Sequence, residues 1–279
     1  MNSQDLSPQL TYYNIGARVR AFSTTRHGGY STGNYAALNV NAYCGDSPEH
    51  VERNRQLLCK ELKLNDINRL IIPHQIHETG ICTIDAAFLQ LSADERQQQL
   101  EGIDAVMTRE PNICIGVSTA DCIPILIYDP QHHAAAAVHA GWRGTLKRIA
   151  TLTVQAMTHT FGSDPSQLKA VIGPGISLKN FEVGREVYDQ FAAAGFPMQL
   201  IADDPLQHSD YQACPFKEEA KPHIDLPLCN RWQLEQAGLP QDHIEYCGIC
   251  TYDETSNYFS ARRLGINSGR IYTAIILND

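Results

Sequence analysis

Short runs of apolar residues, many of them β-branched, recur along the chain and predict β-strands. Residues 17–23 differ from the other runs because apolar and polar positions alternate, which indicates a strand with one buried face. The expected strands are 17–23, 69–72, 81–84, 103–108, 113–118, 123–128, 134–139, 168–172 and 271–277.

Apolar positions one helical turn apart predict four helices. In residues 48–62 the preceding Asp46 and Ser47 are available to cap the first turn, and residues 145–161 carry an apolar face that ends at Gly162. The other two expected helices are 183–194 and 226–237. Many strands with so few helices favour an α+β sandwich, because a regular βαβ series needs a crossover helix between most strands.

No internal repeat, linker or low-complexity segment divides the chain, so we expect a single domain over residues 1–279. The most irregular and polar stretch, residues 203–221, is expected to be a long surface loop.

Composition and charge exclude several classes of protein. The 279 residues are 43% hydrophobic and 19% charged, which is an ordinary globular composition. The 31 acidic residues outnumber the 22 basic ones and no run of Lys or Arg exceeds two, so a nucleic-acid polymer is not the expected ligand. Neither a signal peptide nor a stretch of 18 apolar residues is present, so no membrane span is expected. Nine dispersed cysteines are typical of cytosolic thiols, and we therefore expect a cytoplasmic enzyme.

The densest group of reactive side chains lies in residues 118–144, where two expected strands flank a turn that contains Asp-Pro. If Tyr128 pairs with His133, then Cys122 and His139 lie directly opposite each other, with Cβ atoms roughly 4.5–5.5 Å apart. A thiolate and an imidazole at this spacing can share one metal ion or form a Cys–His catalytic pair. The alternative is a buried Cys and a hydrogen-bonded His at strand ends, and a one-residue shift of register would separate the two.

Two neighbouring features could complete a site. His74 and His77 follow the expected strand 69–72, and a catalytic zinc takes three protein ligands. Arg143 precedes the expected helix 145–161, where free N–H groups attract anions. Considered alone, two histidines in a turn are more often solvated, and such an arginine often pairs with a surface acid.

A set of motifs extends over nearly the whole chain. The motifs are STTRHGG at 23–29, LN at 38–39, NR at 54–55, QIH at 75–77, TADCIP at 119–124, VHAGWRG at 138–144, IGPGI at 172–176, FEVG at 181–184, CTY at 250–252 and FSARR at 259–263. Together they resemble the laccase-domain family, also called the polyphenol-oxidoreductase-like or purine nucleoside phosphorylase family.

The resemblance implies a four-layer α/β/β/α sandwich with mixed sheets, similar to the catalytic core of cytotoxic necrotizing factor. It also implies a zinc ion held by His77, Cys122 and His139, with copper as an alternative occupant. Two departures from the family pattern, Glu78 in place of a glycine and Ala261 in place of an aromatic residue, affect none of these three ligands.

Further site residues are expected, of which Arg26, Asn39 and Arg55 are expected only because of the resemblance. Asp121 is expected to be catalytic, and either Asp121 or Glu182 is expected to move the proton. The expected substrate- or phosphate-binding residues are Arg26, Asn39, Arg55, Arg143 and Glu182.

The implied activities are phosphorolysis of adenosine, inosine and methylthioadenosine to the free base and (methylthio)ribose 1-phosphate, and deamination of adenosine to inosine. Zinc is expected to lower the pKa of water for the deamination. The expected partners are a purine nucleoside and phosphate, without a nucleic-acid polymer or a membrane, and the chain is expected to be a monomer or a small homo-oligomer.

Two other functions stay open. A copper-dependent polyphenol oxidase typically needs many histidines in His-x-His pairs, whereas this chain has 11 histidines and no such pair. A metal-free cysteine hydrolase would instead use Cys122 as the nucleophile and His139 as its base.

Overall fold

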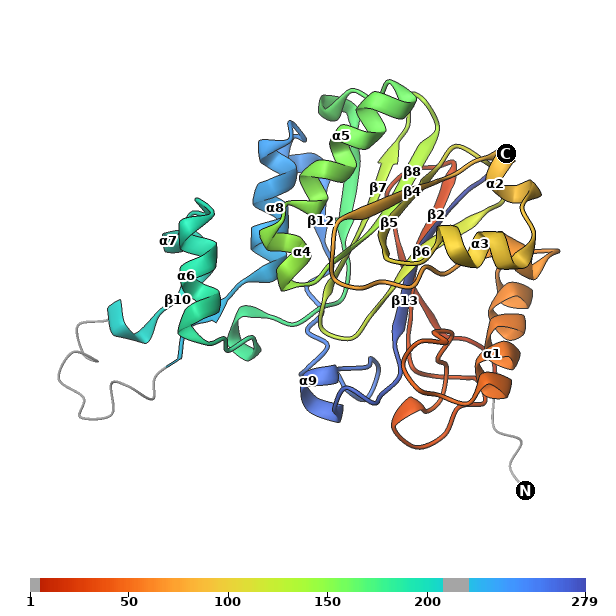
Figure 1. Cartoon of the computed structure of the whole chain (residues 1–279), viewed down its shortest axis with the longest axis horizontal. Helices are drawn as coiled ribbons and strands as arrows, with labels where there is room; N and C mark the ends of the chain where they lie inside the picture. Colours follow the sequence, from red (N-terminus) through yellow and green to blue (C-terminus); the bar gives the residue numbers. More distant parts are fainter. Residues whose placement is uncertain (1–5, 208–220) are drawn as a thin grey trace.

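Two mixed β-sheets pack face to face and carry helices on their outer faces (Figure 1). The structure is a computed structural model that describes residues 6–207 and 221–279. Apolar side chains of the two sheets, such as Ile115, Leu126 and Ile275, meet in a shared core. The layers follow the order helix, sheet, sheet, helix, which confirms the expected four-layer α+β fold.

The five-stranded sheet has the order β1-β2-β13-β6-β3. β3 runs parallel to β6, and the other neighbours are antiparallel, so the sheet is mixed. Its strands are β1 (Leu10–Tyr13), β2 (Val19–Thr24), β13 (Ile271–Leu277), β6 (Cys114–Thr119) and β3 (Leu70–Ile71).

The six-stranded sheet has the order β12-β9-β7-β8-β5-β4, with parallel pairs at both edges. Its strands are β12 (Ile244–Tyr246), β9 (Lys169–Ile172), β7 (Ile123–Asp129), β8 (Ala134–Ala140), β5 (Ile103–Thr108) and β4 (Gly80–Ile84). A separate pair joins β10 (Ala202–Asp203) to β11 (His223–Ile224).

Helices cover both outer faces. α1 (Pro48–Glu61) begins with a proline, whose missing N–H is not needed in the first turn, and packs Leu58 against Phe22 and Tyr272 of the five-stranded sheet. α5 (Ile149–Phe161) and α8 (Leu226–Gln236) cover the six-stranded sheet (Figure 1). The remaining helices are α2 (Ala86–Gln90), α3 (Ala93–Gln99), α4 (Trp142–Leu146), α6 (Arg185–Ala193), α7 (Met198–Ile201) and α9 (Ala261–Leu264).

Strand β8 determines the direction in which His139 points. Ala136 and Val138 pack in the core beneath the helices, whereas Ala135 and Ala137 pack in the core between the sheets. Because successive side chains of a strand alternate between its faces, His139 points toward the space between the sheets, at the end of the strand.

The register of the β7–β8 hairpin differs from the predicted one. Tyr128 pairs with Ala135 rather than with His133, and His139 lies opposite Pro124 rather than opposite Cys122. The cause is the turn, in which the Asp129 carboxylate accepts hydrogen bonds from two backbone N–H groups and places residues 130–133 in the loop. The shift equals two residues, so every side chain keeps its predicted face.

The predicted helix 145–161 is wrong in its extent, because the structure divides this segment into α4 and α5. The helical turns are interrupted at Arg148, whose φ of 66° is left-handed. The Arg148 guanidinium lies 3.9 Å from the ring centroid of Phe196 and 4.6 Å from that of Trp232, and these contacts anchor the interruption. No helix starts at Thr145, where anion-binding N–H groups were expected.

Most other element predictions are confirmed. The strands 103–108 and 271–277 agree with β5 and β13 at both ends. The sequence patterns do not predict β1, β10, β11 or β12, which are two to four residues long. Of the expected surface loop 203–221, residues 208–220 lie outside the described residues.

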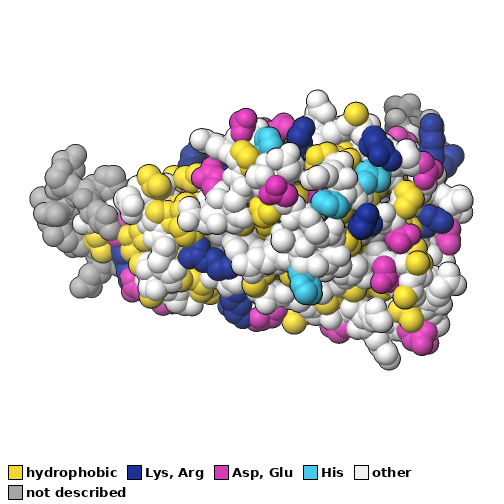
Figure 2. Space-filling model, turned by 90° about the horizontal axis from the view of Figure 1, so that it is seen from above, with side chains coloured by type: hydrophobic (Ala, Val, Ile, Leu, Met, Phe, Trp, Pro, Cys, Tyr) yellow, Lys and Arg dark blue, Asp and Glu magenta, His cyan; other side chains and the backbone are white. Residues whose placement is uncertain are grey.

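The surface carries charges of both signs. Figure 2 shows acidic and basic side chains interspersed on one face, without a large basic patch there. Within residues 6–207 and 221–279, no helix is both long enough and apolar enough to cross a lipid bilayer.

Candidate metal centre

Three side chains from separate parts of the fold converge at one end of the two sheets. His77 lies in the loop after β3, Cys122 directly precedes β7, and His139 lies near the end of β8. One donor atom from each lies within 4.8 Å of the other two. Donors that share one zinc ion lie about 3–4 Å apart, so the three side chains are near the spacing that a shared ion requires.

The cluster faces a cavity of about 600 Å³, a size typical of small-molecule sites. Loops from both sheets form its wall. Besides the three donors, the lining includes Asn41, Tyr43, Cys44, His74, Gln75, Ser118, Thr119, Ala120, Asp121, Trp142, Ile176, Phe181, Ala261, Arg262, Ile266 and Arg270.

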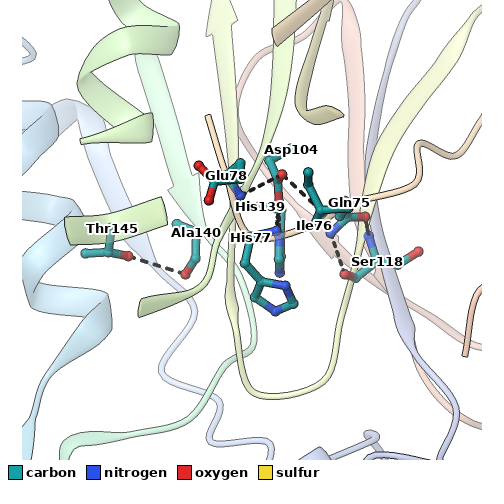
Figure 3. A network of polar contacts seen from close by, with 9 residues as sticks. All are labelled: Gln75, Ile76, His77, Glu78, Asp104, Ser118, His139, Ala140 and Thr145. Atoms are coloured by element: carbon teal, nitrogen blue, oxygen red, sulfur yellow. Dashed lines mark hydrogen bonds and ion pairs between the residues drawn. The ribbon is translucent and has the colours of Figure 1, made fainter. Parts of the chain in front are cut away.

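Asp104 orients two of the donors (Figure 3). One carboxylate oxygen, Oδ1, accepts a hydrogen bond from Nδ1 of His139 at 2.7 Å and from the backbone N–H of His77 at 3.0 Å. The other oxygen accepts from the backbone N–H groups of Ile76 and Glu78. Because a carboxylate accepts at Nδ1, the Nε2 atom of His139 is left to act as the donor to a metal.

The Asp104 carboxylate is held in its charged form. Burial acts to raise its pKa, but the hydrogen bond and charge of His139 and the backbone N–H groups outweigh burial and lower the pKa. The sequence patterns do not identify Asp104, although a single acidic residue within the apolar run 103–108 was an available signal.

Gln75 fastens the same loop to the other sheet. Its side-chain amide donates to the carbonyl oxygen of Ser118 at 2.8 Å and accepts from the N–H of Ser118 at 2.7 Å (Figure 3). The loop that carries His77 is therefore held by β5 on one side and by β6 on the other. His77 itself has a left-handed φ of 66°.

Gly141 leaves the space that the donors occupy. A Cβ atom at this position would lie 2.8 Å from Cδ2 of His77 and 3.0 Å from Sγ of Cys122. Both separations are shorter than ordinary van der Waals contacts, so any larger residue would displace the donors. The space that the donors need therefore explains why the first glycine of the VHAGWRG motif carries no side chain.

The surroundings of Cys122 favour the thiolate form of its side chain. Burial acts to raise the pKa of Cys122, but the charge of His139 and hydrogen bonds to His139 and His77 lower the pKa to about 6. The thiolate in turn raises the pKa of His139 against the effect of burial. A thiolate with two imidazoles is a donor set that zinc and copper both accept.

Asp121 lies beside Cys122 and lines the cavity, but both of its oxygens are engaged. Oδ1 accepts from the hydroxyl of Thr251 at 2.7 Å, and Oδ2 accepts from the backbone N–H of Arg262 at 2.6 Å. Its φ of 85° is left-handed. Asp121 therefore ties α9, and with it the Arg262 side chain, to the metal centre.

The structure does not bring the other five expected residues to the cavity. Arg26 and Arg55 donate to backbone carbonyl groups elsewhere, and the buried Asn39 amide donates within its own loop, including a 2.9 Å bond to Asp46. These three side chains support the N-terminal loops.

Arg143 and Glu182 are exposed, and neither lines the cavity. The Arg143 guanidinium lies over the ring of Trp142 at 4.3 Å, and the Glu182 carboxylate pairs with Lys221 at 3.1 Å.

Two arginines that the sequence patterns do not assign to the site line the cavity instead. Arg270 donates to several backbone carbonyl groups between Ile266 and Gly269, which fixes its guanidinium within its own turn. Within the residues that the structure describes, the Arg262 guanidinium donates only to the backbone carbonyl of Glu182, from both terminal nitrogens. Arg262 belongs to the FSARR motif, but its motif position alone does not indicate a side chain that faces the cavity.

Comparisons with known proteins identify the family of the chain. A family model described as multi-copper polyphenol oxidoreductase laccase matches residues 20–278. The chain is 44% identical to a purine nucleoside phosphorylase of Bacteroides thetaiotaomicron, over 94% of this chain and 93% of the relative. It is 40% identical to adenosine deaminase RL5 from an unknown prokaryotic organism, over 92% and 93% of the two chains.

Solved structures share the fold. YlmD from Geobacillus stearothermophilus superposes with a TM-score of 0.84 at 28% identity and covers 99% of this chain and 100% of its own. YfiH of Bacillus licheniformis gives 0.83 at 31% identity, with 97% coverage of both chains. On the extent of the family match and of these similarities, the chain belongs to the multi-copper polyphenol oxidoreductase laccase family, together with relatives named purine nucleoside phosphorylase.

Proposed function

We propose that this protein is a zinc-dependent enzyme that cleaves purine nucleosides with phosphate. The products are the free base and ribose 1-phosphate, or methylthioribose 1-phosphate from methylthioadenosine. In a second activity it deaminates adenosine to inosine. The observation that carries the proposal is the cluster of His77, Cys122 and His139 in a cavity of small-molecule size. The names of two relatives with high coverage support the substrate class.

The donors fit a metal ion with an open position. His77, Cys122 and His139 would hold it, and Asp104 would keep the His139 ring in the required tautomer. When bound, zinc supplies Lewis-acid polarisation and lowers the pKa of water. Three protein donors leave room for a substrate group, as in other catalytic zinc sites.

The chain's own residues supply the rest of the site. We assign phosphate binding to Arg262, because its guanidinium lines the cavity and, among the described residues, donates to a single backbone carbonyl. Asp121, whose two oxygens are both engaged, positions Arg262 rather than moving a proton. Arg26, Asn39, Arg55, Arg143 and Glu182 are not part of this assignment.

The test combines metal analysis with product analysis. Purified protein should contain one zinc ion per chain. With adenosine and phosphate it should release adenine and ribose 1-phosphate, and without phosphate it should form inosine. All three products should disappear in His139→Ala. Metal-loaded protein that leaves every purine nucleoside unchanged would contradict the proposal.

Activity assays with phenols and with a chelator separate the two alternatives. A copper polyphenol oxidase would consume oxygen with phenols, and more so after copper is added. Within the described residues, however, one group of three or more His, Cys, Asp or Glu side chains has metal-binding spacing, and a multicopper site needs more. A metal-free cysteine hydrolase would keep its activity in the presence of a chelator and lose it in Cys122→Ala.

A further inference from the structure

Tyr43 presents an aromatic ring to the cavity. It lines the cavity wall and is 41% exposed. Two other aromatic rings of the lining are covered: the Phe181 side chain is buried with the Arg262 guanidinium 5.5 Å above its ring, and Trp142 lies beneath the Arg143 guanidinium. Among the Tyr, Trp and Phe side chains that the described lining contains, Tyr43 is therefore the most accessible flat surface.

His74, which also lines the cavity, stacks on one face of the Tyr43 ring. The two rings are nearly parallel, with centroids 4.1 Å apart and an angle of 16° between their planes. Nδ1 of His74 lies 2.7 Å from Oε1 of Glu101. The backbone of His74 is also fixed, because its N–H donates to Leu100 and its carbonyl accepts from Gly102. The stack is thus anchored to the segment that leads into β5.

From this geometry we propose that Tyr43, backed by His74, is the platform on which the purine base of the substrate stacks. The proposal rests on the proposed function for its ligand class. A purine presents a flat π surface, and stacking on an aromatic side chain tolerates different bases. Arg262 contacts Asp121 and Phe181, whereas Tyr43 stacks on His74, so the base and the phosphate are assigned to different side chains.

If the purine base stacks on Tyr43, loss of the ring should change KM for adenosine rather than KM for phosphate. Tyr43→Leu should raise KM for adenosine about tenfold or more at saturating phosphate, because it removes the stacking surface. KM for phosphate should change less than twofold. Tyr43→Phe keeps the ring and should recover most of the lost affinity. His74→Gln should raise KM for adenosine by a smaller factor with kcat nearly unchanged, because His74 acts through Tyr43 as a positioning residue.

Two matched control variants lie outside the cavity. His132→Gln removes another histidine that pairs with a carboxylate, and its side chain is 31% exposed against 33% for His74. Tyr12→Leu removes an exposed tyrosine that packs on Phe22, far from the lining residues in the fold. Both variants should leave KM for adenosine within twofold of the wild-type value.

Calorimetry with adenine as the probe separates this proposal from the proposed reaction. Adenine binding that Tyr43→Leu weakens about tenfold supports the platform even when no phosphorolysis is detected, and in that case only the proposed reaction fails. An active enzyme with an unchanged KM for adenosine in Tyr43→Leu overturns the platform alone. Wild-type protein that binds neither adenine nor adenosine overturns both. A fall in kcat without a change in KM in His74→Gln would assign His74 to proton transfer and contradict its positioning role.

Discussion

At the residue scale, Asp104 orients two of the candidate metal donors without being one of them. Its Oδ1 atom fixes Nδ1 of His139, so Asp104→Asn should allow the wrong tautomer and weaken zinc binding by about 10–100-fold. Competition with a chelator of known affinity measures the change. The control Asp94→Asn, at an exposed carboxylate, should leave the zinc affinity unchanged. Equal zinc affinity in Asp104→Asn and wild-type protein would refute the orienting role.

Gly141 gives a second residue-scale prediction. In Gly141→Ala the added methyl group meets His77 and Cys122 at 2.8–3.0 Å, so the zinc content should fall steeply while the fold is retained. Gly144→Ala is the control, because its Cβ atom would have ordinary contacts of 3.4 Å or more. Metal analysis of the two purified variants makes the comparison. Full zinc occupancy in Gly141→Ala would show that the donors adapt to the methyl group.

Arg262 gives a third prediction. Loss of one charged hydrogen-bonding group typically costs about 1.5–3 kcal/mol, so Arg262→Ala should raise KM for phosphate by about 10–100-fold. KM for adenosine and the phosphate-independent deamination should change much less. Arg143→Ala, at an exposed arginine outside the lining, should change neither constant. Equal losses in both reactions would indicate that Arg262 only supports the fold of α9.

At the element scale, the turn of the β7–β8 hairpin depends on a charged carboxylate. Burial acts to raise the pKa of Asp129, but a hydrogen bond from the Ser163 side chain, together with those from His132 and Gln131 of the turn, outweighs burial and lowers the pKa. Its stabilising contribution is therefore complete above the unfolded-state pKa of about 3.9 and is lost as the pH falls through the lower folded-state pKa.

Asp129→Asn tests this turn. The free energy of unfolding at pH 7 should fall by about 1–3 kcal/mol, and its decrease below pH 4 should become shallower than in the wild-type protein. Urea titrations across this pH range measure both effects. Asp94→Asn in α3, where the side chain is exposed, should leave the profile unchanged. A parallel pH profile in Asp129→Asn would show that the carboxylate charge does not stabilise the turn.

The elements also show which parts of the fold can be predicted from one sequence. Strands β5 and β13 were predictable at both ends because they are long apolar runs. Strands β10, β11 and β12 were not predictable, since two or three residues are too few to show a periodic pattern. The break at Arg148 has no local signal, since contacts with distant Phe196 and Trp232 hold it.

The site residues also divide into those that a local pattern predicts and those that depend on tertiary packing. Cys122 and His139 were predictable as a pair because a hairpin joins them, even though the predicted register was two residues out. Asp104, Tyr43 and Arg262 come from three unrelated segments. Only the packing of the two sheets brings Asp104 to His139 and places Tyr43 and Arg262 in the lining of the cavity.

At the scale of the whole molecule, the metal centre lies at the end of the sandwich and outside its apolar cores. Cys122→Ala, or removal of zinc by a chelator, should therefore leave the far-UV circular dichroism spectrum unchanged. The melting temperature should fall only by the contribution of metal binding. In contrast, Ile115→Ala should cost about 2–5 kcal/mol, because Ile115 is fully buried between the sheets. Unfolding of Cys122→Ala at room temperature would show that the fold depends on the metal.

The shared carboxylate oxygen of Asp104 has a kinetic consequence. Because the same atom binds the His77 amide and the His139 ring, the loop cannot swing outward without loosening the strand-borne donor as well. Opening of the loop and departure of a bound ion would then form a single cooperative event. We therefore expect the residence time of a bound ion to follow the opening rate of residues 75–78 rather than the strength of any one coordinate bond.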